Sequence, residues 1–194
     1  MATDQERALA LIIRALDEIG VPSLVCGSVA SSIHGIPRMT QDVGIVVAME
    51  ARHVEPFAAA IRGAFYVDEA TVHDAVTRRR CFNAIHIETV TKIDVFVRDA
   101  SDWAAAEWSR RVRARVTDAP DSPEVNVSSA EDTLLHKLER YRLGGCISER
   151  QWRDVLGILQ VRGTELDRAY LAERAGRLEL GALLHRAMQE SGVE

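Results

Sequence analysis

The stretch Thr40-Gln41-Asp42-Val43-Gly44-Ile45-Val46-Val47, written TQDVGIVV, has the pattern of a short β-strand that begins beside a carboxylate. Its branched apolar residues favour extended backbone and predict a strand over residues 43–48. Gly44 is unusual there, because glycine in a strand loses more backbone entropy than other residues and leaves a side-chain position empty. Since strand side chains alternate between faces, Asp42 and Gly44 are expected to point to the same side.

Helical and extended patterns alternate around this stretch. Apolar residues at helical spacing predict helices over residues 4–19, 28–33, 50–62, 69–78 and 99–108. Short apolar runs predict further strands over residues 23–26, 81–88 and 92–97, with weaker candidates at 112–117 and 125–127. The strands at 81–88 and 92–97 are expected to pair antiparallel, because the connection between them is short.

After these elements the pattern becomes entirely helical. Ser128 and Ser148 each precede a Glu or Gln by three residues, which fits the capping box at a helix start. Gly144-Gly145 supplies a helix stop between them. We therefore predict a domain of strands and helices over residues 1–127 and a helical C-terminal domain over residues 128–194.

The composition limits the class of protein. The chain has 194 residues, a hydrophobic content of 47% and a formal net charge of −5, which argues against a surface coated with positive charge and neither requires nor excludes nucleic acid. No apolar run approaches the roughly 18 residues of a membrane span, and the first twenty residues do not fit a signal peptide. We expect a cytoplasmic protein with no membrane partner. The three cysteines are far apart, which disfavours a disulfide framework or a zinc site.

A second carboxylate lies within the apolar run KIDVFV, residues 92–97. Ile93, Val95 and Val97 fill one face of this strand and leave Asp94 on the other face with Phe96. A carboxylate in such a run is costly unless it is paired or binds a cation. Two strand carboxylates that converge, here Asp42 and Asp94, are a common way to hold magnesium, which prefers oxygen ligands.

Together, CGS at residues 26–28, DVGI at 42–45 and IDV at 93–95 resemble the signature of the DNA polymerase β-like nucleotidyltransferase superfamily. The segment HGIPRMTQD, residues 34–42, is similar to the small bacterial enzymes that include abortive-infection toxins of the AbiEii type. The resemblance implies an α+β nucleotidyltransferase fold, a mixed sheet flanked by helices, followed by a helical C-terminal domain.

The resemblance also implies roles for individual residues. Gly27 and Ser28 match the turn that grips phosphates, and Asp42 and Asp94 match two catalytic carboxylates that bind Mg²⁺ or Mn²⁺. The implied substrate is a nucleoside triphosphate, and the implied reaction is transfer of a nucleotide to a hydroxyl of tRNA or protein. Some members act as the toxin of a toxin–antitoxin pair, so an antitoxin is an implied partner.

The helical part carries two further matches. Lys137, in the stretch EDTLLHK, and Asp154, in RQWRD, fit positions that accompany the catalytic acids in the toxin-like enzymes. Arg38, with the neighbouring His34, is a candidate nucleotide or phosphate contact. Structural alternatives remain: Lys137 could extend from the rim of an apolar stripe, and Asp154 could be an exposed helix acid or a partner of Arg150.

The sequence departs from the family at the second carboxylate of the Asp-x-Asp pair, where Gly44 stands. Losing one of three carboxylates removes a negative charge and an oxygen ligand, so transfer is expected to be slow or absent. Three accounts stay open: an inactivated variant, a pseudoenzyme that still binds nucleotide, or a site that recruits another acid such as Glu88. The rival functions are a nucleotide-sensing or partner-binding module without catalysis and a purely structural protein.

Overall fold

The computed structural model describes residues 3–40, 42–117 and 122–193. The helices are α1 (Asp4–Glu18), α2 (Gly27–His34), α3 (Val54–Ile61), α4 (Glu69–Arg78), α5 (Asp102–Arg110), α6 (Ala130–Leu143), α7 (Glu149–Arg162), α8 (Arg168–Arg177) and α9 (Gly181–Ser191), with a short 3-10 helix, η1 (Ala51–His53), before α3. The strands are β1 (Ser23–Cys26), β2 (Asp42–Val47), β3 (Phe65–Tyr66), β4 (Cys81–His86), β5 (Thr91–Val97), β6 (Val112–Arg115) and β7 (Glu124–Val127). The expected α+β class with a mixed sheet is confirmed.

The chain divides into two compact units. The first unit comprises residues 1–29 and 40–127, and the second comprises residues 30–39 and 128–194. Helix α2 begins in the first unit and ends in the second. The second unit thus includes a ten-residue segment that the linear division at residue 127 assigned to the first.

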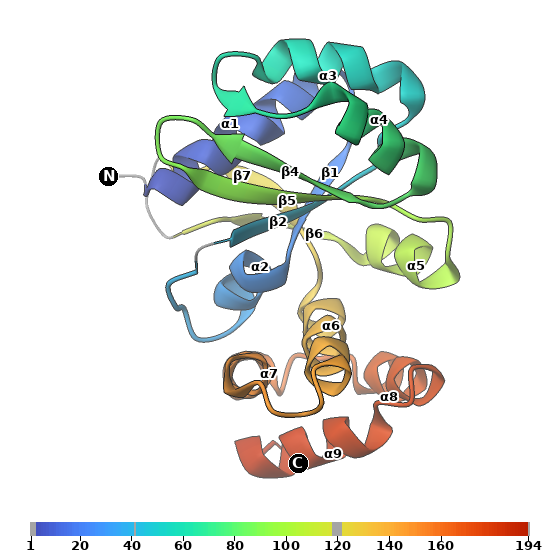
Figure 1. Cartoon of the computed structure of the whole chain (residues 1–194). Helices are drawn as coiled ribbons and strands as arrows, with labels where there is room; N and C mark the ends of the chain where they lie inside the picture. The colour runs from blue at the N-terminus through green and yellow to red at the C-terminus, as the bar shows by residue number, and fades with distance from the viewer. Residues whose placement is uncertain (1–2, 41, 118–121, 194) are drawn as a thin grey trace. The chain divides into compact units, whose positions relative to one another are not determined.

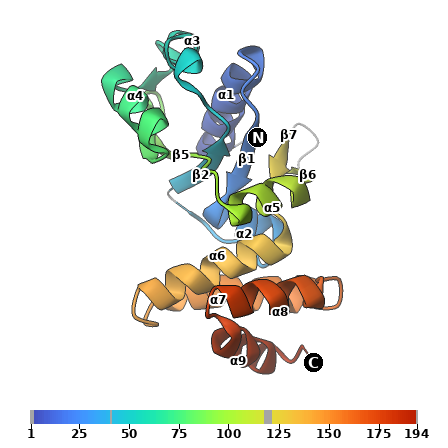
Figure 2. The same cartoon turned by 90° about the vertical axis from the view of Figure 1, so that its right-hand side faces the viewer.

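The first unit is built on one sheet with the strand order β3-β4-β5-β2-β1-β7-β6. Strand β2 pairs parallel with β5 and antiparallel with β1, and β4 pairs antiparallel with β5 as predicted. Helices α1, α3 and α4 lie together on one face of this sheet (Figure 1, Figure 2). Alternate residues of the two central strands are almost fully buried: Val43, Ile45, Val47, Ile93, Val95 and Val97. The intervening residues point to the opposite face, which therefore carries the polar positions.

The second unit is helical. Helix α6 packs against α7 and α8, and α9 packs against α7 and α8. The segment after α2 fits closely against α7, because a Cβ atom at Gly35 would lie 2.8 Å from the backbone of Gly157 and Ile158. Real Cβ atoms do not come that close to backbone, so Gly35 permits this approach.

Two local predictions need correction, and one short strand was missed. Ser129, not Ser128, caps α6 by accepting a hydrogen bond from the Asp132 amide, whereas Ser148 caps α7 as expected. The helix predicted over residues 50–62 is divided into η1 and α3, and the short strand β3 was not predicted. Each difference concerns an element end or a two-residue strand, where local pattern carries little information. Among the described residues, no helix is long and apolar enough to cross a membrane.

Candidate functional site

Four neighbouring strands, β1, β2, β5 and β4, form a row of paired positions that runs through Gly44 and Asp94. Gly44 of β2 lies opposite Cys26 of β1 on one side and opposite Asp94 of β5 on the other. Asn83 of β4 continues the row beyond Asp94. The position predicted for the second carboxylate therefore lies between Cys26 and Asp94. Only a glycine occupies that position.

Asp42 and Asp94 are linked by a lysine that the sequence reasoning did not single out. Lys92 lies opposite Asp42 in the parallel pair of β2 and β5 and two residues before Asp94 on the same face. Its Nζ lies 3.1 Å from Oδ1 of Asp94 and 3.5 Å from Oδ1 of Asp42. The hydrogen bond to Asp94 holds the pKa of Lys92 above its usual value. The side chains are partly exposed, by 42% for Lys92, 55% for Asp42 and 25% for Asp94.

Cys26 faces the position that a second carboxylate would occupy. A Cβ atom built on Gly44 would lie 3.0 Å from Sγ of Cys26 and 3.5 Å from its carbonyl oxygen. The thiol can move by rotation about its χ1 angle, whereas the carbonyl belongs to the strand backbone. An aspartate at position 44 therefore requires the Cys26 thiol to move by a few tenths of an ångström.

The predicted phosphate turn follows directly after this row. Gly27 comes next after Cys26, has φ +69° and begins α2, and Ser28 is the second residue of the helix. A positive φ favours glycine, which explains the residue type at this position. The first turn of a helix presents backbone N–H groups without intrahelical partners, which suit phosphate oxygens.

The donor set does not fit a pair of magnesium ions. Asp42 and Asp94 supply two carboxylates where the signature that the sequence resembles has three, and the Lys92 ammonium already neutralises part of their charge. Glu88, the alternative acid, forms an ion pair with Arg7 of α1 instead, at 3.6 Å. Within residues 3–40, 42–117 and 122–193, no cluster of three His, Cys, Asp or Glu side chains could hold a metal.

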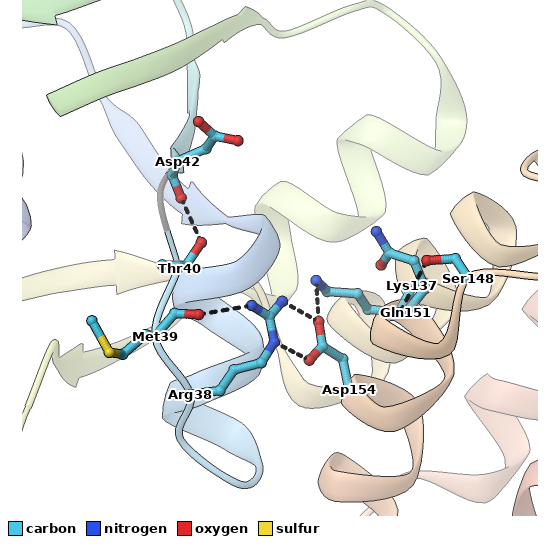
Figure 3. Close-up of polar contacts among 8 residues, drawn as sticks. All are labelled: Arg38, Met39, Thr40, Asp42, Lys137, Ser148, Gln151 and Asp154. Atoms are coloured by element: carbon cyan, nitrogen blue, oxygen red, sulfur yellow. Dashed lines mark hydrogen bonds and ion pairs between the residues drawn. The ribbon is translucent and has the colours of Figure 1, made fainter.

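In the second unit, the structure brings together Arg38, Lys137 and Asp154 (Figure 3). Nε of Arg38 donates to Oδ1 of Asp154 at 2.5 Å, and Nη2 of Arg38 donates to Oδ2 at 2.7 Å. Nζ of Lys137 donates to Oδ2 of Asp154 at 2.7 Å. We call these three residues the charged trio. Asp154 is not an exposed helix acid and Lys137 does not lie at an exposed rim, because their side chains are only 3% and 5% exposed. The ion-pair partners of Asp154 are Arg38 and Lys137, not Arg150 as the other alternative proposed.

The charged trio is held by strong electrostatic interactions in a buried setting. Burial alone would raise the pKa of Asp154, but the hydrogen bonds from Arg38 and Lys137 outweigh it and lower this pKa. The hydrogen bond to Asp154 raises the pKa of Arg38. A bidentate bond between guanidinium and carboxylate fixes geometry as well as charge. Two cations share one anion, so the charged trio carries a formal net charge of +1.

The sequence suggested that His34 contacts a nucleotide together with Arg38, but the side chain of His34 is buried in the second unit. It is 6% exposed, and its Nε2 lies 2.7 Å from the carbonyl oxygen of Ser128. Because a carbonyl only accepts hydrogen bonds, Nε2 carries the proton and the ring is held in one tautomer. Burial lowers the pKa of His34, and the bond to Ser128 opposes this only in part. His34 is therefore a structural residue of the second unit.

Known proteins share the fold but little sequence with this chain. No protein-family model and no curated protein matches it. The solution structure of the antibiotic-resistance factor ANT(2'')-Ia is similar with a TM-score of 0.60 and 15% identity, covering 97% of this chain and 100% of that one. The lincomycin-bound lincosamide antibiotic adenylyltransferase LnuA gives 0.53 and 13%, covering 82% and 98%. A nucleotidyltransferase-like protein from Paracoccidioides brasiliensis gives 0.55 and 15%, covering 96% and 94%. The chain therefore has the nucleotidyltransferase fold.

Proposed function

We propose that the protein binds a nucleoside triphosphate at the phosphate turn of Gly27 and Ser28, and that it transfers the nucleotide slowly or not at all. The observation that carries this proposal is Gly44, which lies between Cys26 and Asp94 where the family has a carboxylate. The fold supports a nucleotidyltransferase origin, although one fold hosts many functions. Asp42 and Asp94 are proposed as the remaining catalytic carboxylates.

Phosphate binding is favoured by groups of the first unit that do not depend on the missing acid. Gly27 starts a helix at a positive φ, and the backbone donors of that helix end attract anions. The donors that bind phosphate are present, but one carboxylate is missing. The protein should therefore bind the triphosphate but catalyse its reaction poorly. The predicted roles of Arg38, Lys137 and Asp154 in nucleotide binding remain part of this proposal.

Two similarities suggest which molecule accepts the nucleotide. The resemblance to AbiEii-type toxins favours a hydroxyl of tRNA or protein, with an antitoxin as partner. The structurally similar LnuA is an antibiotic adenylyltransferase, which adds an antibiotic hydroxyl as an acceptor to be tested. A catalytically inactive module that binds nucleotide or a partner protein is the second candidate, and Gly44 favours it.

Calorimetric titration with ATP, GTP, CTP and UTP, each with and without magnesium, tests nucleotide binding. We expect heat with at least one nucleotide and weaker binding in Gly27→Ala. Gly20→Ala is the matched control, since Gly20 has φ +71° and, like Gly27, has no atom within 4 Å of an added Cβ. Because alanine is equally strained at both positions, weaker nucleotide binding in Gly27→Ala alone would be a local effect on phosphate binding and not a general loss of stability. No heat with any nucleotide would refute the proposal.

A further inference from the structure

We infer that Lys92 acts as a built-in cation of the carboxylate site, occupying with its ammonium group the place between Asp42 and Asp94 that a divalent ion would need. Nζ lies within 3.5 Å of an oxygen of each carboxylate, so it contacts both groups that remain of the metal site. The lysine, not a metal ion, neutralises part of the negative charge of these two carboxylates.

The register of the sheet explains why Lys92 reaches both acids. In the parallel pair of β2 and β5, Lys92 lies opposite Asp42 while Asp94 lies opposite Gly44. The missing carboxylate at position 44 leaves two negative charges on this face, and the lysine supplies one positive charge between them. A magnesium ion prefers six oxygen ligands in a near-octahedral shell and gives up its water reluctantly. Two carboxylates that already bind an ammonium group should therefore bind a magnesium ion weakly.

Gly44 and Lys92 therefore act in the same direction. Gly44 removes a ligand, and Lys92 adds a repulsive charge at the position of the ion. The inference concerns the same site as the proposed function and deepens it, because it makes nucleotide binding at this site independent of magnesium. Its test is read on the protein without nucleotide, so a failure of either proposal is recognised separately.

The test is titration of the protein with Mn²⁺, with free Mn²⁺ followed by electron paramagnetic resonance. We expect weak binding to the unchanged protein and about tenfold tighter binding to Lys92→Met, the size expected when one unit charge is removed close to a divalent ion at a partly exposed site. Arg14→Met is the matched control, because Arg14 forms an exposed ion pair with Glu18 and its loss changes the net charge equally. This control should leave the affinity unchanged.

A second set of variants assigns the effect to the two carboxylates. Adding Asp94→Asn to Lys92→Met should abolish the gain in affinity, and Lys92→Gln should reproduce the gain with a polar side chain. Circular dichroism confirms that each variant is folded before titration. Equal Mn²⁺ affinity in the unchanged protein, Lys92→Met and Lys92→Gln would overturn the inference, and so would a gain that survives Asp94→Asn.

Discussion

Removing the charge of Asp154 should strongly destabilise the protein. Asp154→Asn keeps the size of the side chain but takes away the anion to which Arg38 and Lys137 donate at 2.5 to 2.7 Å. Lys137 is the costly partner, because its side chain is 5% exposed and cannot recover hydration without movement. Loss of one member of a buried ion pair typically costs about 3–5 kcal/mol. Arg38 is 20% exposed and can be partly rehydrated, so we expect about 3 kcal/mol.

Urea unfolding followed by far-ultraviolet circular dichroism measures this loss, and about 3 kcal/mol corresponds to a midpoint shift on the order of 1–2 M. The control is Lys137→Met with Asp154→Leu, which removes the buried ammonium and its counter-charge together and leaves only the partly exposed Arg38 without its carboxylate. Replacing a buried ion pair by apolar groups is often nearly neutral, so this variant should lose about 1 kcal/mol or less. A loss below about 1 kcal/mol in Asp154→Asn, or an equal loss in both variants, would refute the reasoning about charge compensation.

Three further predictions concern single positions. Folding lowers the pKa of the buried His34, so the stability of the unchanged protein should fall as the pH drops below about 6.5. His34→Gln keeps an N–H donor but removes the titrating ring, so its melting temperature should fall less over the same pH range. Gly35→Ala should lower the free energy of unfolding in urea by about 2 kcal/mol or more, because the new Cβ would lie 2.8 Å from backbone atoms. Gly176→Ala, on a helix with open space around the new Cβ, should instead raise it by about 0.5–1 kcal/mol. Equal effects of the two substitutions would contradict this. Gly44→Asp should lower the melting temperature, and adding Cys26→Ala should restore most of the loss, since the thiol lies 3.0 Å from the new Cβ; no rescue would exclude this contact as the cause.

Asp154 should make the protein less stable at acidic pH. Its pKa is lowered in the folded protein, so its contribution is fully present above about pH 4 and is lost as the pH falls through the folded value. Asp154→Asn should lack this part of the profile. The effects of Asp154 and His34 occupy different pH windows, because the two groups titrate near about 4 and 6.5 when unfolded.

Local sequence signals predicted most elements. The helix expected over residues 69–78 is α4 with the same bounds, and the strand expected over residues 23–26 is β1. Helical spacing and strand alternation are short-range patterns, so they are visible without knowing which segments meet. The shared face of Asp42, Gly44 and Asp94 followed from the same alternation together with the family resemblance.

The contacts of the site could not be predicted in the same way. Arg38 is 116 residues from Asp154, and Lys137 is 17 residues from it, so only the folded chain brings the charged trio together. Cys26 lies opposite Gly44 through strand register, which a single sequence does not specify. Lys92 is an intermediate case: its position two residues before Asp94 places it on the same face, but its contact with Asp42 depends on the parallel pairing of β2 and β5.

Transfer of labelled nucleotide tests the central claim about Gly44 most directly. The unchanged protein is compared with Cys26→Ala combined with Gly44→Asp, with Lys92 intact or replaced by Met, using total tRNA, protein and a panel of aminoglycoside and lincosamide antibiotics as acceptors in magnesium buffer. The account predicts little or no label with the unchanged protein, a clear gain when the carboxylate is restored, and loss of that gain on adding Asp42→Asn. Equal transfer in all variants, no gain with any acceptor in either Lys92 background, or a gain that survives Asp42→Asn, would contradict it.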